Sequence, residues 1–229
     1  MATLGGNYIW KSYKAFSGAL GKEYELTLFR IIADADGASL DASNGPVLFT
    51  HGFASDSISW FEIGSSDLAV GTKMANAGYD VWFANLRGTR YSRKNVAWNA
   101  DNDDYIYWNF DISSYAEQDL PKMVKQIVVE SKSCKKLSLI GHSMGTTVQL
   151  NSLSKSSAAA RYISQSVNLA PCIIPDISQI ISGASYDLYD QLETVFSLLG
   201  YYSLFGPDWS SQVDWICLLS LYGPECDTL

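Results

Sequence analysis

Short apolar runs alternate with helical patterns over residues 1–172 of this chain. Several runs have the continuous apolar character of strands buried on both faces of a parallel sheet, namely Pro46–Thr50, Asp80–Ala84, Leu137–Ile140 and Ser166–Pro171. Between them, apolar residues recur at helical spacing at 67–77, 116–131 and 146–153. This alternation predicts an α/β domain with a mostly parallel sheet and flanking helices.

An antiparallel hairpin is expected ahead of this region. Residues Tyr24–Ile32 alternate in polarity and are rich in aromatic and β-branched side chains. The stretch near Tyr13–Phe16 is a suitable partner strand. We therefore predict that the sheet opens with a hairpin and continues with parallel strands.

The pattern changes after Pro171. Residues Ile173–Leu229 have helical periodicity and many aromatic side chains, but no further strand–helix unit. We therefore divide the chain into an α/β core, residues 1–172, and a helical cap or lid segment, residues 173–229, which forms only part of a cap. This segment either packs on the sheet as a helical subdomain or covers an active site with an apolar surface.

A Gly-x-Ser-x-Gly motif lies between a predicted strand and a predicted helix. Its residues are Gly141-His142-Ser143-Met144-Gly145. In this context the serine occupies a strained turn, and the glycines are needed because a Cβ would collide with the neighbouring strand and helix. The helix start places free N–H groups and a positive dipole end near developing negative charge. We interpret Ser143 as a nucleophile, and the alternative is a chance match in a turn.

Composition and charge narrow the functional classes. The chain has 229 residues, 47% of them hydrophobic, and a formal net charge of −8, which together indicate a globular protein and argue against a nucleic-acid partner. No apolar run is long enough for a transmembrane helix, and Met1–Tyr13 shows no secretory signal. Cys217 and Cys226 are close enough for a local disulfide, whereas Cys134 and Cys172 are expected to be buried thiols.

Five stretches, in order, resemble the acid lipases, the gastric and lysosomal group of the α/β-hydrolase fold. They are His51-Gly52-Phe53-Ala54-Ser55 with Trp60, Ala77–Trp82 with Asn85-Leu86-Arg87-Gly88, Ser92–Asn95, Phe110-Asp111 with Tyr115 and Asp119-Leu120-Pro121, and Gly141–Thr147. The family most often has Gln in place of Met144. The resemblance covers about Tyr24 to Pro171, and Cys217 and Cys226 are similar to a disulfide loop of the family's cap.

The resemblance implies a serine ester hydrolase that acts on lipid esters, such as acylglycerols or steryl esters, at a lipid–water interface. It implies a secreted or lysosomal location, and no metal or cofactor. Ser143 would be the nucleophile, with an oxyanion hole formed by the backbone N–H groups of Phe53 and Met144. The motif residues that would support these groups are His51, Gly52, Gly141, His142 and Gly145.

The family's catalytic base has no counterpart in this chain. A serine nucleophile needs a base, and in this fold the Asp and His follow the serine along the chain. Both histidines, His51 and His142, precede Ser143. The His142 ring cannot reach the neighbouring hydroxyl, and His51 is expected to be structural. Asp176 is a minor candidate for the acid.

We therefore interpret the sequence as the N-terminal part of a lipase, with a sheet that is incomplete on its C-terminal side. A truncated gene model, a partial sequence and a short paralogue all fit. The chain alone is expected to be weakly active and poorly stable. Two other functions stay open: another acyl hydrolase such as a thioesterase, and a non-catalytic lipid-binding protein. The missing histidine favours the latter, whereas the intact serine turn argues against it.

Overall fold

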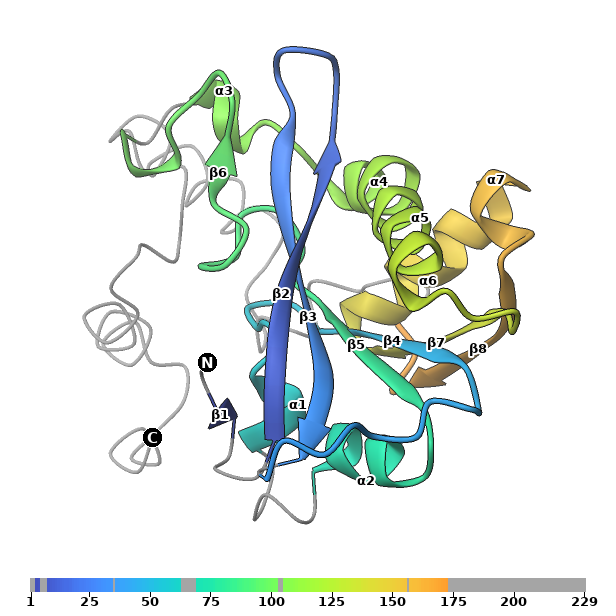
Figure 1. Ribbon diagram of the computed structural model, residues 1–229. Helices are drawn as coiled ribbons and strands as arrows, with labels where there is room; N and C mark the ends of the chain where they lie inside the picture. The colour runs from blue at the N-terminus through green and yellow to red at the C-terminus, as the bar shows by residue number, and fades with distance from the viewer. Residues whose placement is uncertain are drawn as a thin grey trace, which may run out of the picture. The chain divides into compact units, whose positions relative to one another are not determined.

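The computed structural model describes residues 3–4, 8–34, 36–62, 69–102, 105–155 and 157–172. The chain divides into two compact units, residues 1–98 with 110–173, and residues 99–109 with 174–229. An eight-stranded sheet lies in the first unit, in the order β1-β2-β3-β5-β4-β7-β8, with β6 paired to β3 (Figure 1). Its strands are β1 (Thr3–Leu4), β2 (Tyr8–Ser17), β3 (Tyr24–Asp34), β4 (Pro46–Thr50), β5 (Asp80–Ala84), β6 (Lys94–Asn95), β7 (Leu137–His142) and β8 (Ile163–Leu169).

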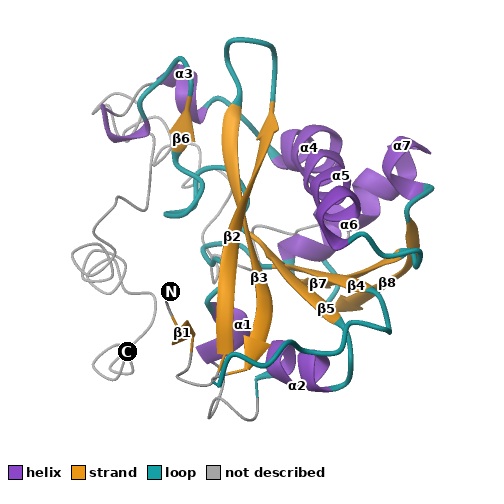
Figure 2. Ribbon diagram, viewed as in Figure 1, coloured by secondary structure: helices purple, strands orange, loops and turns teal. Residues whose placement is uncertain are grey.

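The first half of the sheet is antiparallel, as predicted. Strands β2 and β3 form a long hairpin (Figure 2), and β3 pairs with β5 in antiparallel register, with Phe29 opposite Phe83. An ion pair reinforces this junction, because the guanidinium of Arg30 contacts both carboxylate oxygens of Asp80, at 2.7 and 3.1 Å. The hairpin is thereby tied to the strand that begins the parallel half.

The parallel half consists of β5, β4, β7 and β8. Every residue of β4 and β5 is buried, as expected for strands covered on both faces. Strand β8 begins at Ile163, three residues before the predicted start at Ser166. It lies at the end of the strand order, none of its residues is buried, and its first half is not apolar. Val167 and Leu169 are accordingly 42% and 41% exposed.

Helices cover both faces of the sheet in the first unit: α4 to α7 lie on one face, and α1 and α2 lie on the other (Figure 1). The helices of this unit are α1 (Ser59–Glu62), α2 (Val70–Asn76), α4 (Ile112–Ser114), the π-helical turn η2 (Tyr115–Asp119), α5 (Leu120–Ser131), α6 (Met144–Lys155) and α7 (Ser157–Ala160). In the second unit, the structure describes η1 (Ala100–Asn102) and α3 (Tyr105–Trp108).

The predicted helix at 116–131 is interrupted by a wide turn. In η2 the Leu120 N–H donates to the Tyr115 carbonyl, five residues back, before the regular helix α5 begins. Pro121 accounts for this, because it has no N–H to donate to the carbonyl of Glu117 and therefore leaves the preceding turn free to widen.

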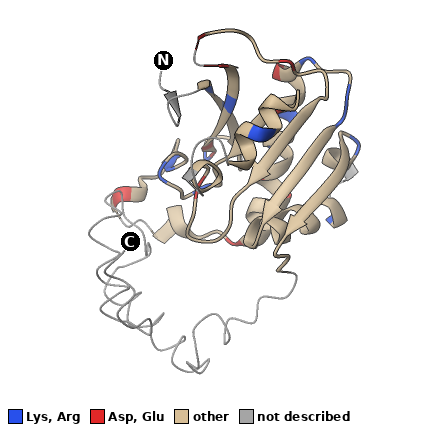
Figure 3. Ribbon diagram, turned by 90° about the horizontal axis from the view of Figure 1, so that it is seen from below, with Lys and Arg blue, Asp and Glu red and all other residues tan. Residues whose placement is uncertain are grey.

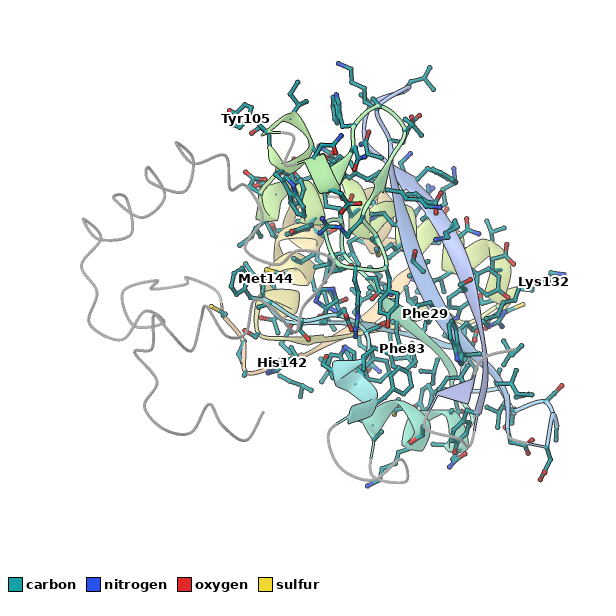
Figure 4. All side chains as sticks on the ribbon, turned by 90° about the vertical axis from the view of Figure 1, so that its left-hand side faces the viewer. Phe29, Phe83, Tyr105, Lys132, His142 and Met144 are labelled. Carbon is teal, nitrogen blue, oxygen red and sulfur yellow. The ribbon has the colours of Figure 1, made fainter. Side chains whose placement is uncertain are left out.

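The core on the α1/α2 side of the sheet is apolar and aromatic. Phe49 and Phe83 stack with their ring centroids 5.3 Å apart, and Phe29 and Trp60 belong to the same buried cluster (Figure 4). Strands β4, β7 and β8 contain no Lys, Arg, Asp or Glu, and charged residues lie mainly on the surrounding helices, loops and hairpin (Figure 3).

The structure tests the predictions for two of the four cysteines, Cys134 and Cys172. Cys134 is exposed, so the prediction of a buried thiol is wrong at this position. It lies in the connection between α5 and β7, where the chain turns at the surface. Cys172 is a half-buried free thiol. Cys217, Cys226, Asp176 and the predicted cap lie outside the described residues.

Candidate active site

Ser143 occupies a strained turn between β7 and α6. Its φ is +49°, in the left-handed region that costs a residue with a Cβ roughly 1–2 kcal/mol. Neighbouring groups stabilise this conformation: the Ser143 N–H donates to the carbonyl of Leu169 at 3.0 Å, and its carbonyl accepts from the N–H and the hydroxyl of Thr146 at 2.9 and 2.6 Å. The turn is therefore held both by the adjacent strand β8 and by the first turn of α6.

Two glycines allow this turn to form so close to the sheet. A Cβ on Gly145 would lie 2.4 Å from the carbonyl oxygen of Thr50 and 2.7 Å from that of His51. A Cβ on Gly141 would lie 3.0 Å from the side chain of Gln149 and from the carbonyl carbon of Gly145. A side chain at Gly145 would therefore collide with the backbone at the end of β4, and one at Gly141 would crowd α6, as the sequence predicted.

The segment that follows β4 lies directly against the serine turn. A Cβ on Gly52 would be 3.4 Å from the Cβ of Ser143 and 3.2 Å from the His142 Nδ1. Ala54, two residues on, has a φ of +52°. In the described part of the chain, the backbone N–H groups of Phe53 and Met144 have no hydrogen-bond acceptor.

His51 is buried and its two ring nitrogens have fixed partners. Nε2 accepts from the Leu86 N–H at 3.2 Å, so the proton is on Nδ1, which donates to the carbonyl of Gly52 at 2.8 Å. Burial lowers the pKa of His51, so the ring is neutral. The ring cannot also accept the Ser143 proton, which makes its contribution structural.

His142 and Met144 flank Ser143 in the chain (Figure 4). The side chain of His142 is exposed, and its ring lies edge-on to Trp60, with ring centroids 6.4 Å apart. Met144 is the first residue of α6, so its N–H lies at the positive end of that helix.

A cavity of about 380 Å³ adjoins the serine. It extends from Gly52 and Phe53 across Trp60 to Val70, and reaches Ser143 and Leu169 on its other side. Phe53, which lines the cavity, is 67% exposed. The cavity presents an apolar surface beside a hydroxyl, an arrangement suited to an apolar ester.

Neither a metal site nor a spanning helix occurs among the residues that the structure describes. No group of three or more His, Cys, Asp or Glu side chains there is arranged to hold a metal ion. Every helix in the same residues is too short or too polar to cross a bilayer.

Asn85, Arg87 and Asp119 form buried contacts near this site that the sequence did not identify. The Arg87 guanidinium donates to both carboxylate oxygens of Asp119, at 2.8 and 2.5 Å, and stacks 4.3 Å over the ring of Tyr24. Burial raises the pKa of Asp119, and the hydrogen bonds from Arg87 oppose that shift. Asn85, Arg87 and Asp119 lie in stretches that resemble the acid lipases, but nothing in the sequence indicated which groups they contact.

A strained serine between a parallel strand and a helix, beside an apolar cavity, defines a hydrolase-type α/β domain. The chain belongs to the alpha/beta hydrolase fold family, whose model matches residues 45–187. This confirms the fold predicted from the sequence.

Curated relatives narrow the similarity to lipases. The chain is 35% identical over 130 residues to "Probable lipase C14C8.15" of Schizosaccharomyces pombe, covering 57% of this chain and 28% of that protein. It is 31% identical over 149 residues to the gastric triacylglycerol lipase of Rattus norvegicus, covering 65% of this chain and 36% of that lipase. It is 30% identical over 166 residues to human lipase member N, covering 69% of this chain and 41% of that protein. These relatives confirm the resemblance to acid lipases, and the chain spans well under half of their length.

Proposed function

We propose that this chain carries the nucleophile and the oxyanion hole of a serine hydrolase that acts on lipid esters. The observation that carries the proposal is the Ser143 turn, whose positive φ is maintained by β8 and α6 beside an apolar cavity. Strain of this kind persists only where the surrounding structure over-determines it, and it clusters at functional sites.

The oxyanion hole in this proposal consists of the N–H groups of Phe53 and Met144. The carbonyl carbon of the ester would be attacked by the Ser143 hydroxyl, and the negative charge that develops on the carbonyl oxygen would be stabilised by these two donors. Removal of one such donor typically costs about 10²–10³ in kcat. The close approach of Gly52 to Ser143 supports this arrangement, because the two segments follow the carboxyl ends of the neighbouring parallel strands β4 and β7.

The apolar cavity favours esters of fatty acids over small polar esters. Phe53, Trp60, Val70 and Leu169 would contact the acyl chain. The curated lipases support lipid esters as the substrate class, and a lipid–water interface with a secreted or lysosomal location belongs to the same proposal.

The base that activates Ser143 is a group other than His51, whose nitrogens are both occupied. A non-catalytic lipid-binding protein is the second candidate function, and this observation favours it. The two candidates differ in one property: only a hydrolase turns over an ester through Ser143.

Replacement of Ser143 by Ala tests the proposal. We expect Ser143→Ala to abolish hydrolysis of a chromogenic butyrate ester, both in this chain and in any longer natural form that contains it. Ser154→Ala is the control, because it removes a serine hydroxyl from an exposed position of α6 outside the cavity, where that hydroxyl donates only to the Asn151 carbonyl at 2.8 Å. Turnover retained in Ser143→Ala contradicts the proposal. Apolar-ester binding without turnover in the unmodified protein supports the non-catalytic candidate.

A further inference from the structure

Residues 51–57, which we call the oxyanion segment, connect β4 to α1 and contain the Phe53 N–H. We propose that Asn85 and Leu86, at the carboxyl end of β5, clamp this segment at both ends, and that Asn85 and His51 are positioning residues for the Phe53 N–H. The inference rests on the proposed function for its catalytic meaning. Its geometry does not depend on that function.

The first end of the segment is fixed through His51. The Leu86 N–H donates to His51 Nε2 at 3.2 Å, and this bond selects the tautomer in which Nδ1–H donates to the Gly52 carbonyl at 2.8 Å. The Gly52 carbonyl and the Phe53 N–H belong to one planar trans peptide unit, in which the two groups point in opposite directions. A hydrogen bond that fixes the carbonyl therefore also fixes the direction of the N–H.

The hydrogen bond from His51 to the Gly52 carbonyl has a second consequence for the Phe53 N–H. Hydrogen bonds in series polarise one another, so a peptide whose carbonyl accepts a bond presents a stronger N–H donor. Both ring nitrogens of His51 are satisfied, and the ring is only 2% exposed. The arrangement is thus shielded from competing water.

The second end of the segment is fixed through Asn85. Its side-chain Oδ1 accepts from the Ser57 N–H at 3.1 Å, while its Nδ2 donates to the carbonyl of Thr27 at 3.2 Å. Its own backbone N–H donates to the same carbonyl at 3.1 Å, and its carbonyl accepts from the Ser92 hydroxyl at 2.8 Å. Asn85 is fully buried and both its backbone and its side-chain groups are engaged.

The clamp is attached to strand β3 of the sheet through Thr27. Thr27 belongs to β3, and its N–H donates to the Ser92 hydroxyl at 2.9 Å, which closes a buried ring of hydrogen bonds around Asn85. Arg87, which follows Leu86 in the chain, forms the buried ion pair with Asp119. Between the two fixed ends, Phe53 and Ala54 are exposed, so the clamp is what determines where the Phe53 N–H points.

The decisive experiment measures the order of the oxyanion segment in solution. Asn85→Leu removes the side-chain hydrogen bonds to the Ser57 N–H and the Thr27 carbonyl and leaves the backbone bond to Thr27 in place. We expect the backbone order parameters of Phe53, Ala54 and Ser57 to fall from the rigid value of about 0.85 to below about 0.6. Val124→Ala is the control, because it removes buried methyl groups from α5, far from the segment in sequence, and should leave these amides unchanged.

A second variant keeps the inference testable if Asn85→Leu fails to fold. His51→Asn loses the bond from Leu86 but retains a donor near the Gly52 carbonyl. Its loss of order should be confined to residues 52–54, with Ser57 unaffected. Order parameters that remain at the unmodified values in a folded Asn85→Leu or His51→Asn protein overturn the clamp.

Catalysis gives an independent measurement. In Asn85→Leu, kcat for the butyrate ester should fall about 10- to 100-fold, less than the loss of a whole oxyanion donor, while KM changes little. An equal rise in KM with constant kcat contradicts a positioning role. If a longer natural form that contains this chain shows no hydrolysis but the order parameters still fall as described, the clamp stands and the proposed function fails.

Discussion

Substitution of Gly145 by Ala tests the close approach between the serine turn and β4. The added Cβ would lie 2.4 Å from the Thr50 carbonyl oxygen and 2.7 Å from that of His51, whereas ordinary contacts begin at 3.4 Å. The contacting atoms are backbone at the end of a fully buried strand, so neither can rotate away. Either the start of α6 or the end of β4 must shift by about 1 Å to restore normal packing.

The expected cost follows from two opposing terms. Overpacking of a well-packed interior costs typically ~1–3 kcal/mol, and a backbone contact belongs at the upper end of that range. Alanine is more favourable than glycine inside a helix by ~1 kcal/mol, which offsets part of the cost. We therefore expect Gly145→Ala to lower the free energy of unfolding by about 2 kcal/mol, or the Tm by about 4–8 °C at this chain length.

Urea unfolding at equilibrium measures this difference. The matched control is Ser154, an exposed residue of the same helix. There, Ser154→Ala should be more stable than Ser154→Gly by ~1 kcal/mol, because only helix propensity distinguishes the two. If Gly145→Ala unfolds at the same or a higher urea concentration than the unmodified protein, with the same m-value, the contact with β4 does not constrain the turn.

Two further predictions concern buried titratable side chains. Burial lowers the His51 pKa below 6.5, so below that pH the unfolded chain binds a proton that the folded protein does not, and stability should fall as the pH is lowered from 7 to 5.5. Urea titrations at both pH values check this, and His51→Asn should lack this part of the pH dependence. Asp119→Asn should cost about 3–5 kcal/mol because it leaves the Arg87 guanidinium buried without its counter-ion. The double replacement Arg87→Met with Asp119→Leu should cost less than the sum of the single ones, and additive losses measured by urea unfolding would contradict the pairing.

The secondary structure and the serine turn were predictable because their signals are local. Strands β4, β5 and β7 are continuous apolar runs, since both of their faces are buried. The turn at Ser143 was predictable because its glycines, its strand and its helix are consecutive in the chain. The edge strand β8 was placed less accurately, because none of its residues is buried and its sequence carries a weaker pattern.

The tertiary structure alone decided which polar groups meet. The partners in these contacts are far apart in the sequence. The separation is 35 residues for His51 and Leu86, 28 residues for Ser57 and Asn85, 58 residues for Asn85 and Thr27, and 32 residues for Arg87 and Asp119. These contacts exist because β5 lies between β3 and β4, an order that hydrophobic periodicity does not encode. A buried polar group needs its partner to within a few tenths of an ångström, whereas an apolar residue needs only to face inward. The pattern of hydrophobicity therefore determined the framework, the Gly141–Gly145 motif determined the Ser143 turn, and the packing of the sheet determined how residues 51–57 are held beside that turn.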